Sequence, residues 1–432
     1  MRFAVGVRLV AALAAGMMAQ SAAAVGVGVA TAKVCDVRTY GAKADGVTKD
    51  TKAIQAAIDD CSKSKGGGTV TLSGGTFLSA PIVLKDNVTL ELATGATLLG
   101  SPDHNDYPQL EVFRAPGRQS LVSADHASNI AITGGGVLDG NGQSWWTEAR
   151  STPGSGIVGV GVFRPRLVVF NYCQHIRMEG VTVQNSPSWQ IVPYYSDDIV
   201  IRNIKVLAPY PSPNTDAIDP FSSSNVVIDH VYADTGDDNV AIKSGEINSP
   251  GPDSPSRNIT ITDCDFEHGH GLSIGSEIAG GVQNVHAERI HFKGTDQGIR
   301  IKSGRDRGND VSQFSFKDLT MEDVKTAILI TEYYPHPAPA GEVPAEPVGR
   351  LTPKFHDFTI ENVKATGSDS AGTIVGLPES PVLGLIMKNV HIAAKTGLSI
   401  AYATVIMNDV VVTPVTGEAM KIAPTATVKI LK

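Results

Sequence analysis

The chain has 432 residues, of which 42% are hydrophobic and 19% are charged, a balance that excludes a disordered protein and predicts a globular one. Its formal net charge of -8 excludes the global basic surface of a nucleic-acid-binding protein, so no nucleic acid is expected as a partner. Such an acidic protein can still bind a polyanion, but only through a local cationic site.

The first 24 residues have the features of an export signal. Arg2 and Arg8 supply positive charge, an apolar stretch rich in alanine follows, and Ala22-Ala23-Ala24 offers a cleavage site. A membrane anchor is the alternative, but the stretch is too short and too rich in alanine to span a bilayer well. The sequence therefore predicts a signal peptide at 1–24, a single catalytic domain at 25–432, and a secreted, extracellular protein without membrane contact after cleavage.

One helix is predicted after the signal, from Thr48 to Ser62. Apolar residues recur there at helical spacing, Asp50 or Thr51 can cap the start, and the glycine run at 66–68 ends the helix. A helix at this place would cover the open end of a β-solenoid, whose first coil otherwise exposes apolar edge groups.

The chain contains four cysteines. Cys35 and Cys61 bracket the predicted helix and can form a disulfide in an oxidising compartment. Cys173 and Cys264 lie within strand-like runs, where they are either ordinary buried thiols or a second disulfide. No two cysteines have the spacing of a zinc-ligand pair, so they predict no zinc site.

From Thr69 onward the pattern changes to short runs of alternating residues, of which Val88–Leu92 is the first clean one. Many runs begin with a polar residue, a second short strand tends to follow, and the middle runs recur every ~25 to 35 residues, which is a solenoid period. The runs begin at Asn129, His175, Asp198, Asn225 and Asn258, and later ones near Asn284, Phe314, Phe358, Asn389 and Val405.

Together, the helix and the runs predict an all-β fold: a single-stranded, right-handed parallel β-helix with an N-terminal capping helix. A propeller or a β-sandwich is the alternative, but neither has a recurring polar residue just before each apolar strand. In a β-helix such residues can stack from coil to coil into hydrogen-bonded ladders.

Four short polar motifs follow one another in the middle of the chain, about one repeat apart. If the coils stack, residues of successive motifs become neighbours at the ~4.8 Å strand spacing. Carboxylates, an imidazole, a guanidinium and an ammonium would then line one small patch. The motifs are Asn214-Thr215-Asp216, Gly236-Asp237-Asp238, Gly269-His270-Gly271 and Arg300-Ile301-Lys302.

Asp216, Asp237 and Asp238 are the candidate catalytic acids. Taken alone, each motif is more typical of a solvated turn, but stacking would crowd the three carboxylates together. Their mutual repulsion raises at least one pKa and leaves a protonated acid beside ionised bases. Hydrolysis of a glycosidic bond needs this combination, because one carboxyl protonates the leaving oxygen while another deprotonates water.

The other two motifs supply an imidazole and two cations. His270 stands between two glycines that would give a ligand access, and its ring can tune a neighbouring acid. A metal site formed with His268 has little support, because no third ligand is evident nearby. Arg300 and Lys302 share one face of a strand, which is either an exposed face or a pocket for a substrate carboxylate.

In this order and at these spacings, the four motifs resemble those of the polygalacturonases of glycoside hydrolase family 28. The resemblance begins near Val37 and includes Tyr40–Gly46, the Gly135–Gly140 turn and Trp145-Trp146. It implies a right-handed parallel β-helix that hydrolyses α-1,4 bonds between galacturonic acid residues with inversion, without a metal or other cofactor. The implied partner is polygalacturonate, the de-esterified form of pectin, and we expect the enzyme to be a monomer.

The resemblance also gives roles to single residues. Asp237 matches the family's general acid, while Asp216 and Asp238 match the pair that activates water. His270 matches a residue of the catalytic site beside the scissile sugar.

The residues expected to bind substrate come from three places in the chain. Arg300 and Lys302 match residues around the scissile sugar, and Asn214 of the first motif is assigned to substrate binding with them. Tyr334 best fits the place of a family tyrosine after the last motif, with Tyr333 as the alternative.

The expected mode of attack is endo. Gly236–Lys243 and Gly269–Glu277 look most like the same stretches of bacterial endo-acting members, and between the first and last motifs only Asn248–Ser256 is a modest insertion. An exo mode is the alternative, because the loops Ser151–Gly161 and Pro335–Pro353 could close one side of a substrate groove. A calcium-dependent pectate lyase, which shares the β-helix, and a non-catalytic sugar-binding β-helix are further alternatives.

Overall fold

The computed structural model describes residues 33–112, 115–152, 161–245, 254–339 and 341–431. The predicted signal peptide at 1–24 lies outside the described residues, as do most of the two loops predicted at 151–161 and 248–256. The strands belong to a single compact unit of the chain. No helix within the described ranges is long and apolar enough to cross a membrane.

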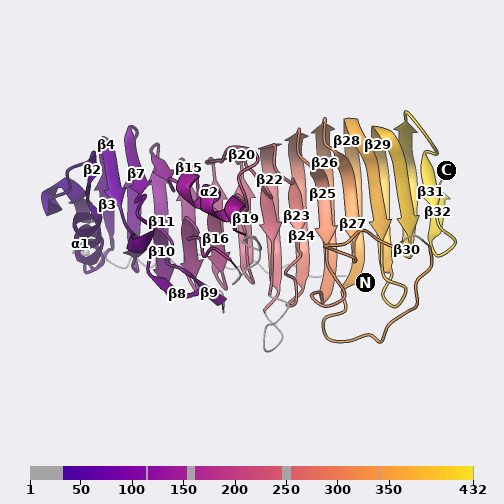
Figure 1. The fold of residues 1–432 in the computed structure, drawn as a ribbon, viewed down its shortest axis with the longest axis horizontal. Helices are drawn as coiled ribbons and strands as arrows, with labels where there is room; N and C mark the ends of the chain where they lie inside the picture. Colours follow the sequence, from indigo (N-terminus) through magenta and orange to yellow (C-terminus); the bar gives the residue numbers. More distant parts are fainter. Residues whose placement is uncertain (1–32, 113–114, 153–160, 246–253, 340, 432) are drawn as a thin grey trace, which may run out of the picture. The chain divides into compact units, whose positions relative to one another are not determined.

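Each coil of the chain passes through three stacks of strands in a fixed order, and Figure 1 shows strands of successive coils lying side by side. Strands confined to the first stack are β1 (Lys33–Asp36), β3 (Gly68–Leu72), β6 (Val88–Leu92), β11 (Ser128–Gly134), β14 (Gln174–Glu179), β17 (Asp197–Arg202), β19 (Ser224–Asp229) and β32 (Thr427–Leu431). Those of the second are β2 (Asp45–Lys49), β4 (Gly75–Ser79), β7 (Ala96–Gly100), β12 (Val137–Asp139), β15 (Thr182–Gln184), β18 (Lys205–Leu207) and β20 (Tyr232–Asp234).

The third stack carries the predicted motifs. Its strands are β5 (Ile82–Leu84), β10 (Val122–Asp125), β13 (Val168–Asn171), β16 (Ile191–Tyr194), β21 (Val240–Ile242), β23 (Leu272–Ile274), β25 (Gln297–Lys302), β27 (Thr326–Thr331) and β31 (Met420–Ile422). Longer strands bend from one stack into the next: β22 (Ser256–Glu267), β24 (Val282–Lys293), β26 (Asp310–Glu322), β28 (Lys354–Val375), β29 (Val382–Ala401) and β30 (Ala403–Pro414).

Paired strands of these stacks run parallel wherever the structure describes them. The predicted right-handed parallel β-helix is therefore confirmed, and the propeller and the β-sandwich are excluded. In β6, Val88, Leu90 and Leu92 are buried inside the coil, while the two residues between them are half-buried. Successive side chains of a strand point to opposite faces. Burial of each such apolar side chain stabilises the fold by about 1.5–3 kcal/mol.

Asparagines near the starts of the first-stack strands form the predicted ladder. Asn225, Asn258 and Asn284 stand at the same turn of successive coils, with φ of 56°, 56° and 55°. Asparagine tolerates this left-handed region better than most residues do. The side-chain amide of Asn258 donates to Asn225 over 3.0 Å, and that of Asn284 donates to Asn258 over 2.9 Å. These bonds help to hold neighbouring coils in register.

The capping helix is α1 (Thr51–Cys61), which lies within the predicted range but is shorter at both ends. Its buried side chains include Ile54 and Ile58. Asp50 occupies the N-cap position, as predicted, but its side chain does not cap the helix. Instead, the carboxylate accepts hydrogen bonds from the amides of Lys43 and Ala44 over 2.7 and 2.9 Å, and so fixes the preceding turn.

The cysteines divide into a pair and two separate thiols. Cys35 and Cys61 form the predicted disulfide, which joins β1 to the last residue of α1. Cys173 and Cys264 are buried and free, so the alternative of ordinary thiols holds for both. Burial raises the pKa of the Cys173 thiol to about 11, so this thiol is protonated near neutral pH.

Several shorter elements decorate the coils. They are the 3-10 helices η1 (Val37–Tyr40) and η2 (His104–Asp106), the antiparallel hairpin β8 (Gln109–Val112) and β9 (Ala115–Arg118), and α2 (Gln143–Ser151). Val112 of the hairpin packs on an apolar cluster outside the main core, formed by Val169, Trp189, Val192, Tyr194 and Phe221. After β27 the chain leaves the coils as a long loop, orange in Figure 1, which contains the predicted loop at 335–353.

Candidate active site

The four predicted motifs meet on successive coils of the third stack. Parallel bridges join Ile218 to Val240, and β21, β23 and β25 continue the pairing in register. Asp216 and Asp238 each stand two residues before these bridged positions, and the amide of Ala217 donates to the carbonyl of Asp238 over 2.9 Å. The stack therefore brings together residues that lie up to 86 positions apart, counted from Asp216 to Lys302 (302 − 216).

Asp238 lies at the centre of the site and is almost fully buried. Its Oδ1 accepts hydrogen bonds from Arg300 over 2.9 Å and from Ser273 over 2.6 Å, and its Oδ2 accepts one from Lys302 over 2.9 Å. Burial alone would raise the pKa of this carboxyl, but the two cations outweigh burial and hold the pKa far below its usual range. Asp238 is therefore an ionised carboxylate over the whole working range of an enzyme.

Asp237 is paired with the predicted imidazole. The Nδ1 of His270 lies 3.0 Å from Oδ1 of Asp237 and 3.1 Å from Nη1 of Arg300. One nitrogen cannot donate to Asp237 and accept from Arg300 at once, and the surrounding carboxylates favour the donating, protonated ring. Burial lowers the pKa of His270, but the contact with Asp237 outweighs it and the net shift is upward. Burial raises the pKa of Asp237, and the same contact reverses that into a net lowering.

Asp216 behaves differently from the other two acids. It is buried, and the nearest cation in an ion pair with it is Lys243, whose Nζ lies 3.7 Å from Oδ2. Burial and the negative charges of Asp237 and Asp219 raise the pKa of Asp216 well above its usual range. The predicted crowding thus raises at least one pKa, and in this unliganded site the raised value belongs to Asp216.

The glycines beside His270 have a backbone role. Gly269 and Gly271 have φ of 78° and 73°, a region that other residues adopt only with strain. A Cβ on Gly269 would lie 2.2 Å from the carbonyl oxygen of Asp237, and one on Gly271 would lie 2.0 Å from that of Gln297. The sequence interpretation, in which small flanks give a ligand access, misses this close approach of neighbouring coils.

Tyr334 lies over the two predicted cations. Its ring centre is 5.7 Å from the guanidinium carbon of Arg300 and 5.3 Å from Nζ of Lys302. The neighbouring Tyr333 instead lies 5.7 Å from the guanidinium carbon of Arg305 and lines a separate cavity of about 150 Å³. Arg300 and Lys302 are buried, so the alternative of an exposed strand face does not apply.

Asn214 is at the edge of this arrangement. Its backbone is in the left-handed region, with φ of 55°, and its Oδ1 accepts a hydrogen bond from Nη2 of Arg164 over 2.6 Å. Arg164 also donates to the carbonyls of Pro187 and Pro213, over 2.9 and 2.7 Å. The structure therefore links Asn214 to a buried arginine that none of the four motifs contains.

Among the described residues, three groups of acids and histidines lie close enough together to hold a cation. The group of Asp237, Asp238 and His270 is a poor fit, because Arg300 and Lys302 already place two positive charges on Asp238. The second group is Asp234, Glu267 and His268. Its His268, the predicted partner of His270, turns away from His270, since its Nδ1 lies 2.9 Å from Asp234.

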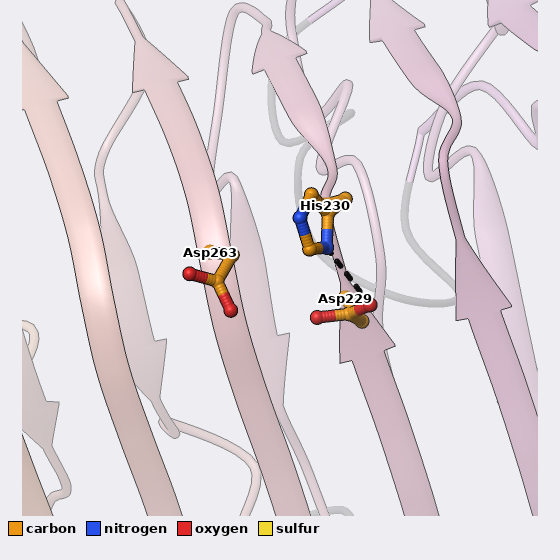
Figure 2. A group of neighbouring side chains, drawn as sticks. All are labelled: Asp229, His230 and Asp263. Carbon is orange, nitrogen blue, oxygen red and sulfur yellow. Dashed lines mark hydrogen bonds and ion pairs between the residues drawn. The ribbon is translucent and has the colours of Figure 1, made fainter.

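The third group lies on the outside of the coils. Figure 2 shows the hydrogen bond between His230 and Asp229, and Asp263 on the next coil. Both oxygens of Asp263 accept hydrogen bonds from Arg289, over 2.7 and 2.8 Å, and Asp229 also accepts one from Thr262 over 2.7 Å. These carboxylates are therefore already satisfied by protein donors.

Comparison with known proteins places this arrangement in a family. A model of the glycosyl hydrolases family 28 matches residues 63–421. The chain belongs to this family. A probable polygalacturonase from Vitis vinifera is 33% identical over 374 residues, which cover 82% of this chain and 74% of the relative. An endo-polygalacturonase from Pectobacterium carotovorum subsp. carotovorum is 29% identical, with 84% of this chain and 89% of the relative covered.

A solved family 28 structure is also similar. The hyperthermoactive exopolygalacturonase from Thermotoga maritima has a TM-score of 0.75 and 29% identity, and the match covers 90% of this chain and 93% of that one. The relatives thus include proteins described as endo and as exo.

Sequence reasoning missed three charged residues of this family 28 site: Lys243, Asp219 and Glu277. Lys243 directly follows Ile242 at the end of a short apolar run, as Lys302 directly follows Ile301. This shared Ile-Lys step is a signal for a second outward-pointing lysine. Glu277 carries no such signal, because it reaches Lys243 from a loop after β23, over 3.2 Å.

Proposed function

We propose that the site around Asp216, Asp237 and Asp238 performs the hydrolysis of polygalacturonate that the family membership indicates. The observation that carries this proposal is the stacking of three carboxylates directly beside two buried cations, Arg300 and Lys302. The names of the relatives, which include a probable polygalacturonase and an endo-polygalacturonase, support this substrate. Because pectin is an extracellular polymer, we also propose that the protein is secreted.

The geometry supports a division of labour among the acids. Asp238 stays ionised and can orient and polarise the attacking water, while Asp216 accepts the proton of that water once Asp216 is itself ionised. Asp237 protonates the leaving oxygen. We propose that the water attacks from the face opposite the leaving oxygen, which inverts the configuration of the sugar.

His270 supports the role of Asp237 as the general acid. In the unliganded site the proton that the pair shares resides on the ring, which lowers the pKa of Asp237. An imidazolium beside a carboxylate carries one transferable proton, as a neutral imidazole beside a carboxylic acid does. The single proton can therefore pass from the ring to Asp237, and Asp237 then gives it to the glycosidic oxygen.

Arg300, Lys302 and Tyr334 form the proposed binding place for a galacturonate carboxylate. Lys302 has three N–H donors and uses one of them on Asp238, so its charge also serves a ligand that enters beside the Tyr334 ring. A methyl ester removes the negative charge of the substrate. Fully methyl-esterified pectin is therefore expected to be a poor substrate.

One feature supports an exo mode rather than the endo mode that the sequence favours. On the N-terminal side of the acids, Val169, Val192 and Phe221 belong to the apolar cluster outside the main core and are at most 7% exposed. Trp189 and Val112 of the hairpin pack with them. A polysaccharide cannot lie on strand positions that are already covered. The cover would therefore stop one end of the polygalacturonate polymer.

The strand face is more open on the other side. Leu329, Thr373 and Ser399 continue the outward row of Arg300 on the next coils, and all three are half-buried. A face covered at one end and accessible at the other fits a substrate that enters with its terminus. We therefore propose exo-attack, and retain endo-attack as the competing mode.

Purified protein and polygalacturonate provide the direct test of hydrolysis. We expect new reducing ends without the ultraviolet absorbance of an unsaturated sugar, which a pectate lyase would produce. The Asp237→Asn variant is the matched control for contaminating activity. Ultraviolet absorbance that rises with the reducing ends would refute hydrolysis, and sugar binding without any reducing ends would indicate a non-catalytic β-helix.

A further inference from the structure

Lys243 is a buried cation next to the proposed base, and none of the four motifs contains it. It follows β21 and is 4% exposed. Its Nζ lies 3.7 Å from Oδ2 of Asp216 and 3.2 Å from Oε2 of Glu277. It also lies 4.7 Å from the ring centre of Trp189. These contacts fix the ammonium on three sides.

The register of the third stack places one lysine beside Asp216 and another beside Asp238. Ile242, Ile274 and Ile301 pair across three coils, so the residues that follow them, Lys243, Gly275 and Lys302, continue the same row. Gly275 has φ of 104°, and a Cβ there would lie 3.4 Å from Cγ of Lys302 and 2.0 Å from its carbonyl oxygen. The glycine therefore allows the close approach of the coil that carries Lys302.

The two lysines serve different acids in this row. Lys302 donates to Asp238 over 2.9 Å, whereas Lys243 pairs with Asp216. Arg300 and Ser273 also donate to Asp238, whereas the cations that act on Asp216 are Lys243, which forms an ion pair with it, and the guanidinium of Arg164. Removal of Lys243 should consequently raise the pKa of Asp216 far more than the pKa of Asp238.

Several other charges face Lys243 and must be counted. Asp219 precedes it on the neighbouring coil and is fully buried, and neither of its carboxylate oxygens has a hydrogen-bond partner within the described part of the chain. Burial raises the pKa of Asp219, which favours its neutral form. Glu277 reaches Lys243 from the loop after β23, and its pKa is lowered because Lys243 outweighs the effect of its burial.

The remaining charges are Asp238 just before β21 and Lys302 on β25, and Arg166 lies against the same Trp189 ring, with its guanidinium carbon 4.7 Å from the ring centre. Asp238 is matched by its own cations, so Lys243 is left between Asp216, Asp219 and Glu277. Among the groups that act most strongly on the buried Asp216, Lys243 is the one whose charge favours the ionised carboxylate.

We infer that Lys243 is a positioning residue that favours the ionised form of Asp216 and directs its carboxylate toward the attacking water, and that Glu277 anchors Lys243 in this place. The inference rests on the proposed function, since it needs Asp216 to accept a proton from water. A protonated Asp216 lacks the negative carboxylate oxygen that would accept the proton of water, so it cannot act as the base. Lys243 thus extends the working range of the enzyme to lower pH.

The test compares Lys243→Met with Lys243→Arg and with the matched control Lys317→Met. Lys317 is an exposed lysine whose Nζ lies 3.1 Å from Glu288 on the outside of the coils. We expect Lys243→Met to move the acidic limb of the kcat/KM profile upward by about one pH unit, which is a tenfold loss on that limb, with recovery at higher pH. Lys243→Arg should keep the limb near its wild-type position, and Lys317→Met should not move it.

A second readout does not depend on catalysis. Titration of the Asp216 carboxyl in unliganded protein, followed by carbon NMR and assigned with Asp216→Asn, should show a higher pKa in Lys243→Met. If Lys243→Met fails to fold because it strands Glu277, the Lys243→Met/Glu277→Gln double variant removes both charges and should show the same upward shift.

The outcomes separate this inference from the proposed function. An unchanged Asp216 titration and a pH-independent loss of activity in Lys243→Met would overturn the inference and leave the hydrolase assignment intact. Absence of wild-type activity on polygalacturonate would overturn the proposed function, while the NMR titration would still report whether Lys243 controls the ionisation of Asp216.

Discussion

The ammonium of Lys302 donates to Asp238 over 2.9 Å, although the two residues are 64 positions apart in the chain. Both side chains are buried, so the pair is shielded from water and salt. Arg300 donates to the other oxygen of the same carboxylate. The stacking of coils thus produces a fixed negative charge, held by two cations, next to two further acids.

Lys302→Met should destabilise the protein as well as inactivate it. The substitution leaves a buried carboxylate with one of its two cations, and loss of one partner of a buried pair costs about 3–5 kcal/mol. Unfolding in urea measures this loss against wild type. Lys317→Met, which breaks an exposed pair with Glu288, is the control and should unfold at the wild-type urea concentration. Equal midpoints for all three proteins would contradict the buried pair.

The Asp237–His270 pair predicts the alkaline limb of activity. The pKa of His270 is raised, so the shared proton is present at lower pH and is lost as pH rises through that raised value. We expect kcat to fall along this limb in wild type. Asp237→Asn should lose about 10²-fold in kcat at every pH, the usual scale for one acid/base group.

His270→Asn tests the same pair. It should move the alkaline limb to lower pH and lower kcat at its optimum, because Asp237 must then hold the transferred proton without the imidazole. The stability that the pair contributes has the same sign: it is present below the ordinary pKa of histidine and is lost as pH rises through the raised value. The free energies of unfolding of wild type and His270→Asn should therefore differ most at low pH, within the range where Asp237 is ionised. An unchanged alkaline limb in the variant would contradict the assignment.

Tyr334 and Tyr333 form a matched pair of adjacent tyrosines with different surroundings. The ring of Tyr334 covers the two cations at the proposed carboxylate site, whereas Tyr333 lies beside Arg305. Tyr334→Ala should raise KM for oligogalacturonates about tenfold through lost contact with the sugar and with the cations. Tyr333→Ala should leave KM unchanged, and the reverse pattern would move the substrate-binding role to Tyr333.

The repeat and the meeting of the motifs could be predicted because both depend on local patterns. Alternation within Val88–Leu92 and the polar residue before each strand are readable in the sequence, and stacking then makes neighbours of Asp216 and Asp238. Which acid has the raised pKa could not be predicted. That depends on which oxygen each cation reaches, as the different partners of Lys302 and Lys243 show.

The cover on the N-terminal side was unpredictable for another reason. Val112 lies in a hairpin, and its contact with the cluster around Trp189 spans most of two coils of intervening sequence. No periodicity in the sequence marks such a contact, because the hairpin is not part of the repeat and packs on the coils through the shape of its side chains. The loops at 151–161 and 335–353, which the sequence suggests as walls of the groove, are recognised by their composition alone.

The disulfide predicts a change in stability without a change in chemistry. Cys35 and Cys61 close a loop with a sequence separation of 26, and a cross-link of this span contributes about 3 kcal/mol in the chain-entropy view. The Cys35→Ser/Cys61→Ser double variant should therefore melt at a lower temperature, with kcat at 25 °C unchanged because the site lies on later coils. Cys264→Ser, at a buried free thiol, is the control for loss of a sulfur atom. A lowered kcat in the double variant would show that the cap influences the site.

The covered strand face decides between the two modes of attack. If the polymer end stops against Trp189 and the hairpin that carries Val112, polygalacturonate is shortened from its terminus. The viscosity should then fall slowly while mono- or digalacturonate appears from the start of the reaction. A rapid fall in viscosity with mixed oligomers at early times would contradict exo-attack and restore the endo mode expected from the motifs. Val112→Asp gives a second measurement, because a charge on the apolar cluster should loosen the cover. Under exo-attack this variant should release longer products than wild type, whereas an endo enzyme should keep its product distribution.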